Sequence, residues 1–203
     1  MYENSMAEQF TTLTAIAAPY DPVNVDTDRI IPARFLKFPR KDGYGQYLFH
    51  DVREEPGFVL NRAPFDRARI LVANANFGCG SSREGAAYAF HDAGFRSVIA
   101  PSFGDIFYNN CMKNGIVPVR LPEEECSALR AMLSSKPGTE ITVDLESQQV
   151  SVQGDKHPFE IDAFYREMLL KGVDELGLTL TLLPEIVRFE RDYSEFGDGA
   201  RSS

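Results

Sequence analysis

Length, composition and charge exclude several classes of protein. The chain has 203 residues, which suits one globular domain, and its 43% hydrophobic and 25% charged residues are typical of folded soluble proteins. With 21 basic against 30 acidic residues, the net charge of −9 argues against a general nucleic-acid or anionic-membrane binder. No apolar run approaches the roughly 20 residues of a membrane helix and no signal peptide is recognisable, so we expect a cytoplasmic protein.

The N-terminal third begins with a predicted strand and continues as a long irregular segment. Phe10–Ala17 mixes aromatic and β-branched residues and predicts a strand. Residues 34–57 contain several prolines and glycines and predict a long loop with one helical turn, and loops of this length usually bind something. The loop carries the basic residues Lys37, Arg40 and Lys41.

Strands and helices alternate from residue 69 onward. Ile70–Ala73 is a continuous apolar run, which is typical of a strand covered on both faces. The following segments predict a helix at 83–93, a strand at 97–101, a helix at 103–114, a strand at 116–121, a helix at 122–134, a hairpin at 140–152, a helix at 162–170 and a last helix at 184–193. This order predicts an α/β fold with a mixed, partly parallel sheet flanked by helices. We expect one domain over 1–203, with an ordered core at about 10–193 and flexible ends.

The cysteines and histidines predict no metal site. The three cysteines form no CxxC pair, so neither a disulfide framework nor a zinc knuckle follows. Cys111 and Cys126 lie on predicted helices and are expected to be buried structural residues. None of the three histidines stands at ligand spacing to another.

The glycine-rich turn before the helix at 83–93 predicts an anion site. Glycines allow the backbone to approach a ligand, and the free N–H groups of a helix start attract anions. A P-loop is excluded because Ala86 stands where the phosphate-binding lysine belongs, and a dinucleotide fingerprint is disfavoured because Arg83 replaces its third glycine. Two hydroxyls and a guanidinium remain: an arginine can bind a carboxylate through two bonds, and a serine among N–H donors can act as a base. The structural alternative is that Ser81 and Ser82 cap the helix while Arg83 pairs with Glu84 or solvent.

Three segments of the sequence resemble motifs of the aconitase superfamily and, within it, of 3-isopropylmalate dehydratase small subunits. They are Asn-Phe-Gly-Cys-Gly-Ser-Ser-Arg-Glu at 76–84, Asn-Val-Asp-Thr-Asp-Arg-Ile-Ile-Pro at 24–32 and Ala-Pro-Ser-Phe-Gly-Asp-Ile-Phe-Tyr-Asn-Asn at 100–110. The resemblance runs from about Phe10 to Tyr193. It implies the swivelling β/β/α domain of aconitases as a separate polypeptide. It also implies a large-subunit partner that holds a [4Fe-4S] cluster, and interconversion of 2- and 3-isopropylmalate by dehydration and rehydration in leucine biosynthesis.

The resemblance also assigns roles to residues. Ser81 becomes the candidate base that removes a carbon-bound proton, Ser82 assists, and Arg83 binds a substrate carboxylate. Further substrate contacts are predicted for Arg34, Lys37, Arg40, Lys41 and Gly80. Asp26, Thr27 and Asp28 match a family motif, and capping a helix or holding a loop would explain them equally well.

Two departures from the family pattern leave the substrate open. Gly85 replaces the family's usual histidine, at a cost of roughly 1 kcal/mol relative to Ala in a helix, and Lys41 stands where an arginine is usual. A small subunit acting on citraconate, methylmalate or another alkyl-malate is therefore an alternative. A non-catalytic module that binds a dicarboxylate is an alternative of another class.

Overall fold

One mixed sheet of seven strands organises the part of the chain that the computed structural model describes, residues 8–181, 183, 185–189, 191 and 193. The order of the strands across the sheet is β4-β3-β2-β1-β5-β6-β7. The strands are β1 Thr12–Pro19, β2 Ile70–Val72, β3 Ser97–Ala100, β4 Val117–Arg120, β5 Glu140–Asp144, β6 Gln149–Val152 and β7 Asp155–Pro158.

Strand β1 joins a parallel half of the sheet to an antiparallel half. It pairs in parallel with β2, Ala17 opposite Ile70, and antiparallel with β5, Thr12 opposite Asp144. Strands β2, β3 and β4 are parallel, and β5, β6 and β7 are antiparallel. The predicted mixed sheet is therefore confirmed, and so is the hairpin of β5 and β6.

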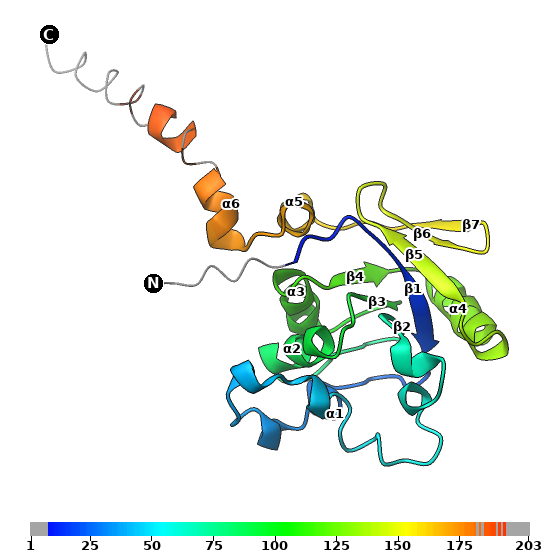
Figure 1. Cartoon of the computed structure of the whole chain (residues 1–203). Helices are drawn as coiled ribbons and strands as arrows, with labels where there is room; N and C mark the ends of the chain where they lie inside the picture. The colour runs from blue at the N-terminus through cyan, green and yellow to red at the C-terminus, as the bar shows by residue number, and fades with distance from the viewer. Residues whose placement is uncertain (1–7, 182, 184, 190, 192, 194–203) are drawn as a thin grey trace, which may run out of the picture.

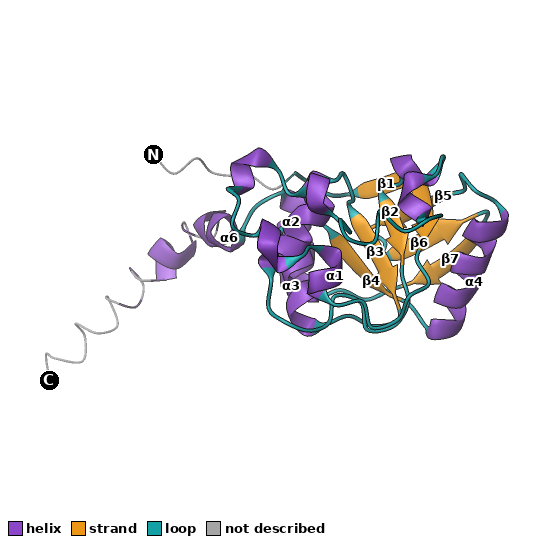
Figure 2. Ribbon diagram, turned by 90° about the horizontal axis from the view of Figure 1, so that it is seen from below, coloured by secondary structure: helices purple, strands orange, loops and turns teal. Residues whose placement is uncertain are grey.

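Helices cover both faces of this sheet. Helices α2 (Glu84–Asp92) and α3 (Asp105–Lys113) lie on one face and α4 (Glu123–Ser135) lies on the other, with the sheet between them (Figure 2). Because both faces are covered, every residue of β2 and β3 is apolar or hydrogen-bonded and buried. The helices are α1 Thr27–Ile30, α2 Glu84–Asp92, α3 Asp105–Lys113, α4 Glu123–Ser135, α5 Ala163–Lys171 and α6 Glu175–Thr181. Among the described residues, none of these is long and apolar enough to cross a membrane.

Several elements differ from the sequence-based predictions. The long loop holds three short 3-10 turns, at 33–35, 40–42 and 45–47, instead of one helical turn. Strand β7 was not predicted, because its four residues are mostly polar and exposed. Helix α6, Glu175–Thr181, was not predicted; the side chain of Asp174 accepts a hydrogen bond from Gly177 N at 2.6 Å and so helps to start it. Pro184, the predicted start of the last helix, lies outside the described residues. Residues 185–189 are helical, whereas the ends predicted to be flexible fall largely outside the described residues.

The two ends of the described chain lie close to one side of the molecule. Residues 8–11 lead into β1 near α5, and α6 follows α5 and points away from the body (Figure 1). The backbone N–H of Phe10 donates to the carbonyl of Leu169 at 2.9 Å, so the segment that precedes β1 is attached to α5.

Candidate active site

Two of the three sequence motifs meet at the carboxyl end of β2. Asp26 and Cys79 form an isolated parallel bridge, in which Thr27 N donates to the carbonyl of Cys79 at 3.0 Å. The hydroxyl of Thr27 donates to the carbonyl of Ser81 at 2.9 Å. Residues separated by more than fifty positions therefore hold the backbone of the predicted catalytic loop, residues 76–84, which we call the serine loop.

The third motif supports the same loop from the other side. Phe77 and Phe103 form a second parallel bridge, with Phe77 N donating to Ser102 O at 3.0 Å and Gly104 N to Phe77 O at 2.9 Å. The hydroxyl of Ser102 also accepts from Asn76 N at 2.8 Å. All three motifs are therefore adjacent in the structure.

A buried phenylalanine anchors the loop in the core. Phe77 is 0% exposed and its ring lies 5.6 Å from Phe107, 5.8 Å from Phe90 and 6.3 Å from Tyr20, edge to face in each case. The next residue, Gly78, has φ +72°, and a Cβ there would come within 2.3 Å of the Phe107 ring. The start of the loop is therefore fixed by packing and requires glycine at 78.

The two serines lie at the exposed tip of the loop. Helix α2 begins at Glu84 with Arg83 in the capping position, and no side-chain hydrogen bond caps it. Among the described residues neither serine hydroxyl has a hydrogen-bond partner, and both residues are exposed. The alternative that Ser81 and Ser82 cap the helix is therefore wrong, and both hydroxyls are available to a ligand.

Arg83 is held by the second aspartate of the Asp-Thr-Asp motif. Its Nη1 forms an ion pair with Asp28 Oδ1, and its side chain is 21% exposed against 57% for Asp28. Pairing of Arg83 with Glu84, the structural alternative, is not found. Asp28 also accepts a hydrogen bond from Ala33 N at 2.9 Å, and this bond, followed by the one from Arg83, lowers the pKa of its carboxyl below the usual value.

Each member of the Asp-Thr-Asp motif has a structural task. Asp26 caps α1 by accepting from Arg29 N at 2.7 Å, Thr27 holds the serine loop, and Asp28 holds Arg83. The prediction that these residues cap a helix and hold a loop is confirmed. Thr27 and Asp28 contact the predicted site directly, through Ser81 and Arg83.

The basic segment of the long loop lies partly over α2. The guanidinium of Arg40 stacks on the Tyr88 ring at 3.4 Å from its centroid, one turn beyond Glu84. Arg34 pairs with Asp51, with Nη1 2.9 Å from Oδ2. The remaining predicted contacts are exposed. Gly80 lies in the serine loop itself, whereas within the described part of the chain no side-chain bond joins Lys37 or Lys41 to that loop.

Gly85, the departure in the signature motif, makes room for the long loop. A Cβ at this position would come within 2.4 Å of Leu36 Cδ2 and 3.5 Å of the Tyr44 ring. Leu36 therefore occupies the space that a side chain at 85 would fill. The unusual glycine and the position of the loop over α2 depend on each other.

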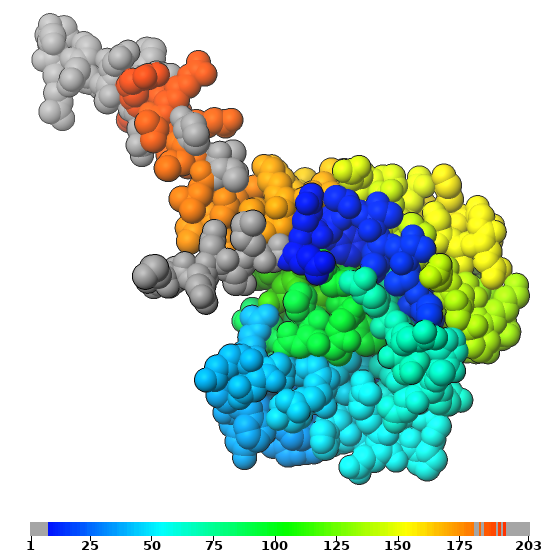
Figure 3. All heavy atoms as spheres, viewed as in Figure 1, coloured from blue at the N-terminus to red at the C-terminus, as the bar shows by residue number. Residues whose placement is uncertain are grey.

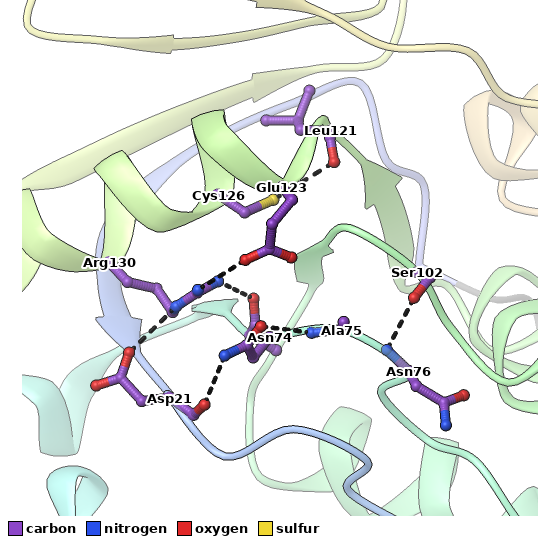
Figure 4. A network of polar contacts seen from close by, with 10 residues as sticks. Asp21, Asn74, Ala75, Asn76, Ser102, Leu121, Glu123, Cys126 and Arg130 are labelled. Atoms are coloured by element: carbon purple, nitrogen blue, oxygen red, sulfur yellow. Dashed lines mark hydrogen bonds and ion pairs between the residues drawn. The ribbon is translucent and has the colours of Figure 1, made fainter.

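One supporting residue was missed in the sequence. Arg130 on α4 is 6% exposed and donates to the carbonyl of Ala73 at 2.9 Å, to Asp21 at 3.1 Å and to Glu123 at 3.3 Å (Figure 4). Asn74 extends this network by donating to the carbonyl of Asp21 at 2.8 Å. The guanidinium thus joins the chain just after β1 to the chain just after β2, where two of the motifs begin.

The cysteines of this chain do not fit an iron-sulfur cluster. Cys111 and Cys126 are 0% exposed on different helices, and burial raises the pKa of the Cys126 thiol to about 12, so it stays protonated. Cys79 is half-buried in the serine loop. In the described ranges no three His, Cys, Asp or Glu side chains are placed to hold a metal ion.

Fold and site together define an α/β domain with an exposed loop, carrying two serine hydroxyls and an arginine paired with Asp28, at the carboxyl end of its parallel strands. The family model for the aconitase C-terminal domain matches residues 7–124, and a second model, described as LeuD_N, matches residues 127–163. The 3-isopropylmalate dehydratase small subunit of Granulibacter bethesdensis is 52% identical over 191 residues, which cover 91% of this chain and 92% of that one. The small subunit of Gluconobacter oxydans is 50% identical, over 90% and 91%.

The solved structures agree with these sequence comparisons. The crystal structure of 3-isopropylmalate dehydratase from Methanocaldococcus jannaschii superposes with a TM-score of 0.65 at 27% identity, covering 87% of this chain and 99% of that one. The chain belongs to the family of 3-isopropylmalate dehydratase small subunits, within the aconitase superfamily.

Proposed function

We propose that this chain is the small subunit of a hydro-lyase that interconverts 2- and 3-isopropylmalate through isopropylmaleate in leucine biosynthesis. The relatives at about half identity over nine tenths of the chain support this reaction. The observation that carries the assignment of the site is the meeting of three distant motifs around two exposed serine hydroxyls and one oriented arginine. A cytoplasmic location is part of the proposal.

Ser81 and Arg83 divide the work of this chain. Ser81 Oγ, in its alkoxide form, takes the proton from the carbon next to a substrate carboxylate. The electron pair of that C–H bond forms the double bond as hydroxide leaves the neighbouring carbon, where the partner chain would receive it. Arg83 binds a carboxylate through its free N–H groups, while Asp28 holds the other side of the guanidinium. Ser82 assists as a second hydroxyl, and Arg34, Lys37, Arg40, Lys41 and Gly80 complete the substrate contacts.

Removal of the substrate hydroxyl is assigned to a partner chain. Two of the three cysteines are fully buried, so the [4Fe-4S] cluster does not fit this chain, and we place it on a large subunit. The exposure of Ser81 and Ser82 is consistent with a site that is closed by that subunit.

Reconstitution with a cluster-loaded large subunit tests the proposal. We expect isopropylmaleate absorbance to appear from 2-isopropylmalate, and the same assay with citraconate and methylmalate identifies the alkyl group that the site accepts. Ser81→Ala should lower turnover by at least about 10²-fold while assembly is retained, because loss of a general base removes the proton transfer. Ser135→Ala, an exposed serine at the end of α4, serves as the matched control. Full activity of Ser81→Ala would refute the assigned base, and absence of turnover with every cognate large subunit would refute the enzyme and favour the dicarboxylate-binding module.

A further inference from the structure

The C-terminal helix carries a large apolar surface that is exposed in the described part of the chain. We use this name for α6 together with the helical residues that follow it up to 193. Exposed fractions on this helix reach 64% for Leu176, 68% for Phe189 and 71% for Tyr193. The exposed large hydrophobic residues of the helix are Leu176, Leu180, Leu183, Ile186, Val187, Phe189 and Tyr193.

Four of these residues form one continuous stripe. Leu176, Leu180, Leu183 and Val187 follow one another at intervals of four, three and four residues, which places them on one face of a helix. The stripe is about 16 Å long at 1.5 Å per residue. Leu178, by contrast, is 4% exposed. The helix therefore rests on the body near its start and then projects from it (Figure 3).

The start of the helix is connected to the catalytic loop. Lys113, at the end of α3, pairs with Glu175 at 2.8 Å between Nζ and Oε1. The next residue, Asn114, donates to Glu84 Oε1 at 3.4 Å, and Glu84 directly follows Arg83. In both ribbon views α6 lies at the same end of the molecule as α2 and α3 (Figures 1 and 2).

We infer that the stripe Leu176, Leu180, Leu183 and Val187 docks into an apolar groove on the large subunit, in the manner of an amphipathic helix in a groove. The inference rests on the proposed function, which requires the large subunit to approach Ser81. Because the helix starts beside the site, its stripe extends the same contact surface outward. A second copy of this chain would cover the stripe too, but it would supply nothing that the site lacks. An exposed apolar surface of this size on a projecting helix is typical of a protein interface.

Lysine substitutions on the two sides of the helix test this inference. The Leu180→Lys/Val187→Lys variant places charge in the stripe without loss of helix propensity. Glu185→Lys introduces the same side chain on the opposite side, since residue 185 is turned by about 170° from the stripe at 100° per residue. The full chain and the large subunit, both purified, are titrated by isothermal calorimetry, and turnover of 2-isopropylmalate is measured at saturating large subunit.

We expect the double variant to raise the dissociation constant at least about tenfold and to keep the wild-type turnover at saturation, while Glu185→Lys changes neither. An unchanged dissociation constant for the double variant overturns the inference. So does a loss of self-association of the isolated chain with no change in large-subunit affinity, which would assign the stripe to a second copy. If the wild type associates and turns over but the double variant does so equally well, only the inference fails. If the wild type shows neither association nor turnover, the proposed function fails with it.

Discussion

At the scale of single residues, Asp28 connects the start of the long loop to Arg83, the arginine proposed to bind substrate. One carboxylate oxygen accepts both the Ala33 amide and the Arg83 guanidinium. Arg83 therefore has a fixed orientation before any substrate arrives, and the order that binding would otherwise impose on a long side chain is already present.

Replacement of this carboxylate tests its role. Asp28→Asn should lower kcat/KM by about tenfold, roughly 1.4 kcal/mol, because the charge that orients Arg83 is lost. Steady-state kinetics of the assembled enzyme would measure it. Asp155→Asn, in the exposed edge strand β7, is the control, and an unaltered kcat/KM in Asp28→Asn would contradict the orienting role.

The lowered pKa of Asp28 predicts that the free energy of unfolding depends on pH, and the same variant tests this. The folded-state pKa of Asp28 is lowered from 3.8, chiefly by the Ala33 amide and next by Arg83, so its contribution is present above the unfolded value and is lost as the pH falls through the folded value. Since Asp28 is exposed, the contribution should be less than about 1 kcal/mol. Urea unfolding from about pH 7 to about pH 3 should show the wild type and Asp28→Asn converging below 3.8. A difference that grows toward acid pH would disprove this.

The cysteines give a further prediction. Cys111 and Cys126 are fully buried and the pKa of Cys126 is about 12, so neither should react with a thiol reagent in the native state at about pH 8. Ellman titration should count at most one accessible thiol, Cys79, and all three after unfolding. Cys79→Ser should abolish the native reaction, and rapid native reaction at two or more thiols would show that the buried helices open.

At the scale of elements, the fit of the long loop over α2 depends on one missing side chain. Leu36 occupies the space beside Gly85, where the Cβ of an alanine would otherwise lie. The chain gains this packing contact at the cost of the higher helix propensity of alanine. Gly85→Ala in the wild type should be neutral or destabilising, whereas in the Leu36→Ala background it should stabilise by up to about 1 kcal/mol. A double-mutant cycle by urea denaturation measures this coupling. Equal effects of Gly85→Ala in both backgrounds would mean that Leu36 does not limit position 85.

Packing of the serine loop predicts a large loss for one substitution. Phe77 is fully buried among aromatic rings, so Phe77→Ala should lower the free energy of unfolding by about 3–5 kcal/mol. Phe164→Ala, on the exposed side of α5, should cost far less. Chemical denaturation of both variants decides it, and similar losses for the two would contradict the role of Phe77 as an anchor.

An element can be predicted from the sequence when neighbouring residues determine it, and not when contacts with distant segments determine it. The run Ile70–Ala73 predicts β2 because continuous apolar character is local, whereas the four mostly polar residues of β7 pair only because β6 lies beside them. The three motifs likewise point to segments that the structure brings together. The pair of Arg83 and Asp28, 55 residues apart, was not predicted, because it depends on the bridge between Asp26 and Cys79.

At the scale of the whole molecule, α4 stabilises the site from the opposite face of the sheet. Arg130 falls in the buried stripe of α4, which also contains Cys126, Leu129 and Leu133, and it lies four residues after Cys126 and three before Leu133. A charged residue in such a stripe is a signal that a buried polar network exists, and this signal could have been read from the sequence.

Removal of the Arg130 guanidinium should therefore lower the free energy of unfolding. Arg130→Met leaves the buried carbonyl of Ala73 without its donor, whereas the carboxylates of Asp21 and Glu123 stay exposed, so we expect about 1–3 kcal/mol of lost stability. Thermal and urea denaturation measure it. Arg166→Met, whose guanidinium bonds the carbonyl of Leu145 near the surface, is a matched control. Loss of less than about 1 kcal/mol in Arg130→Met would show that water replaces the guanidinium without cost.

The two isolated bridges, Asp26 with Cys79 and Phe77 with Phe103, determine how this enzyme loses its site when the chain is shortened or unfolded. Each motif owes its conformation to another that lies far away in the chain, so no peptide cut from this sequence retains a working site. A ribosome-bound chain likewise acquires the site only after the third motif has emerged. Inactivation by heat and melting of the parallel half of the sheet should therefore be one event, with no stage at which the domain is folded but the site is absent.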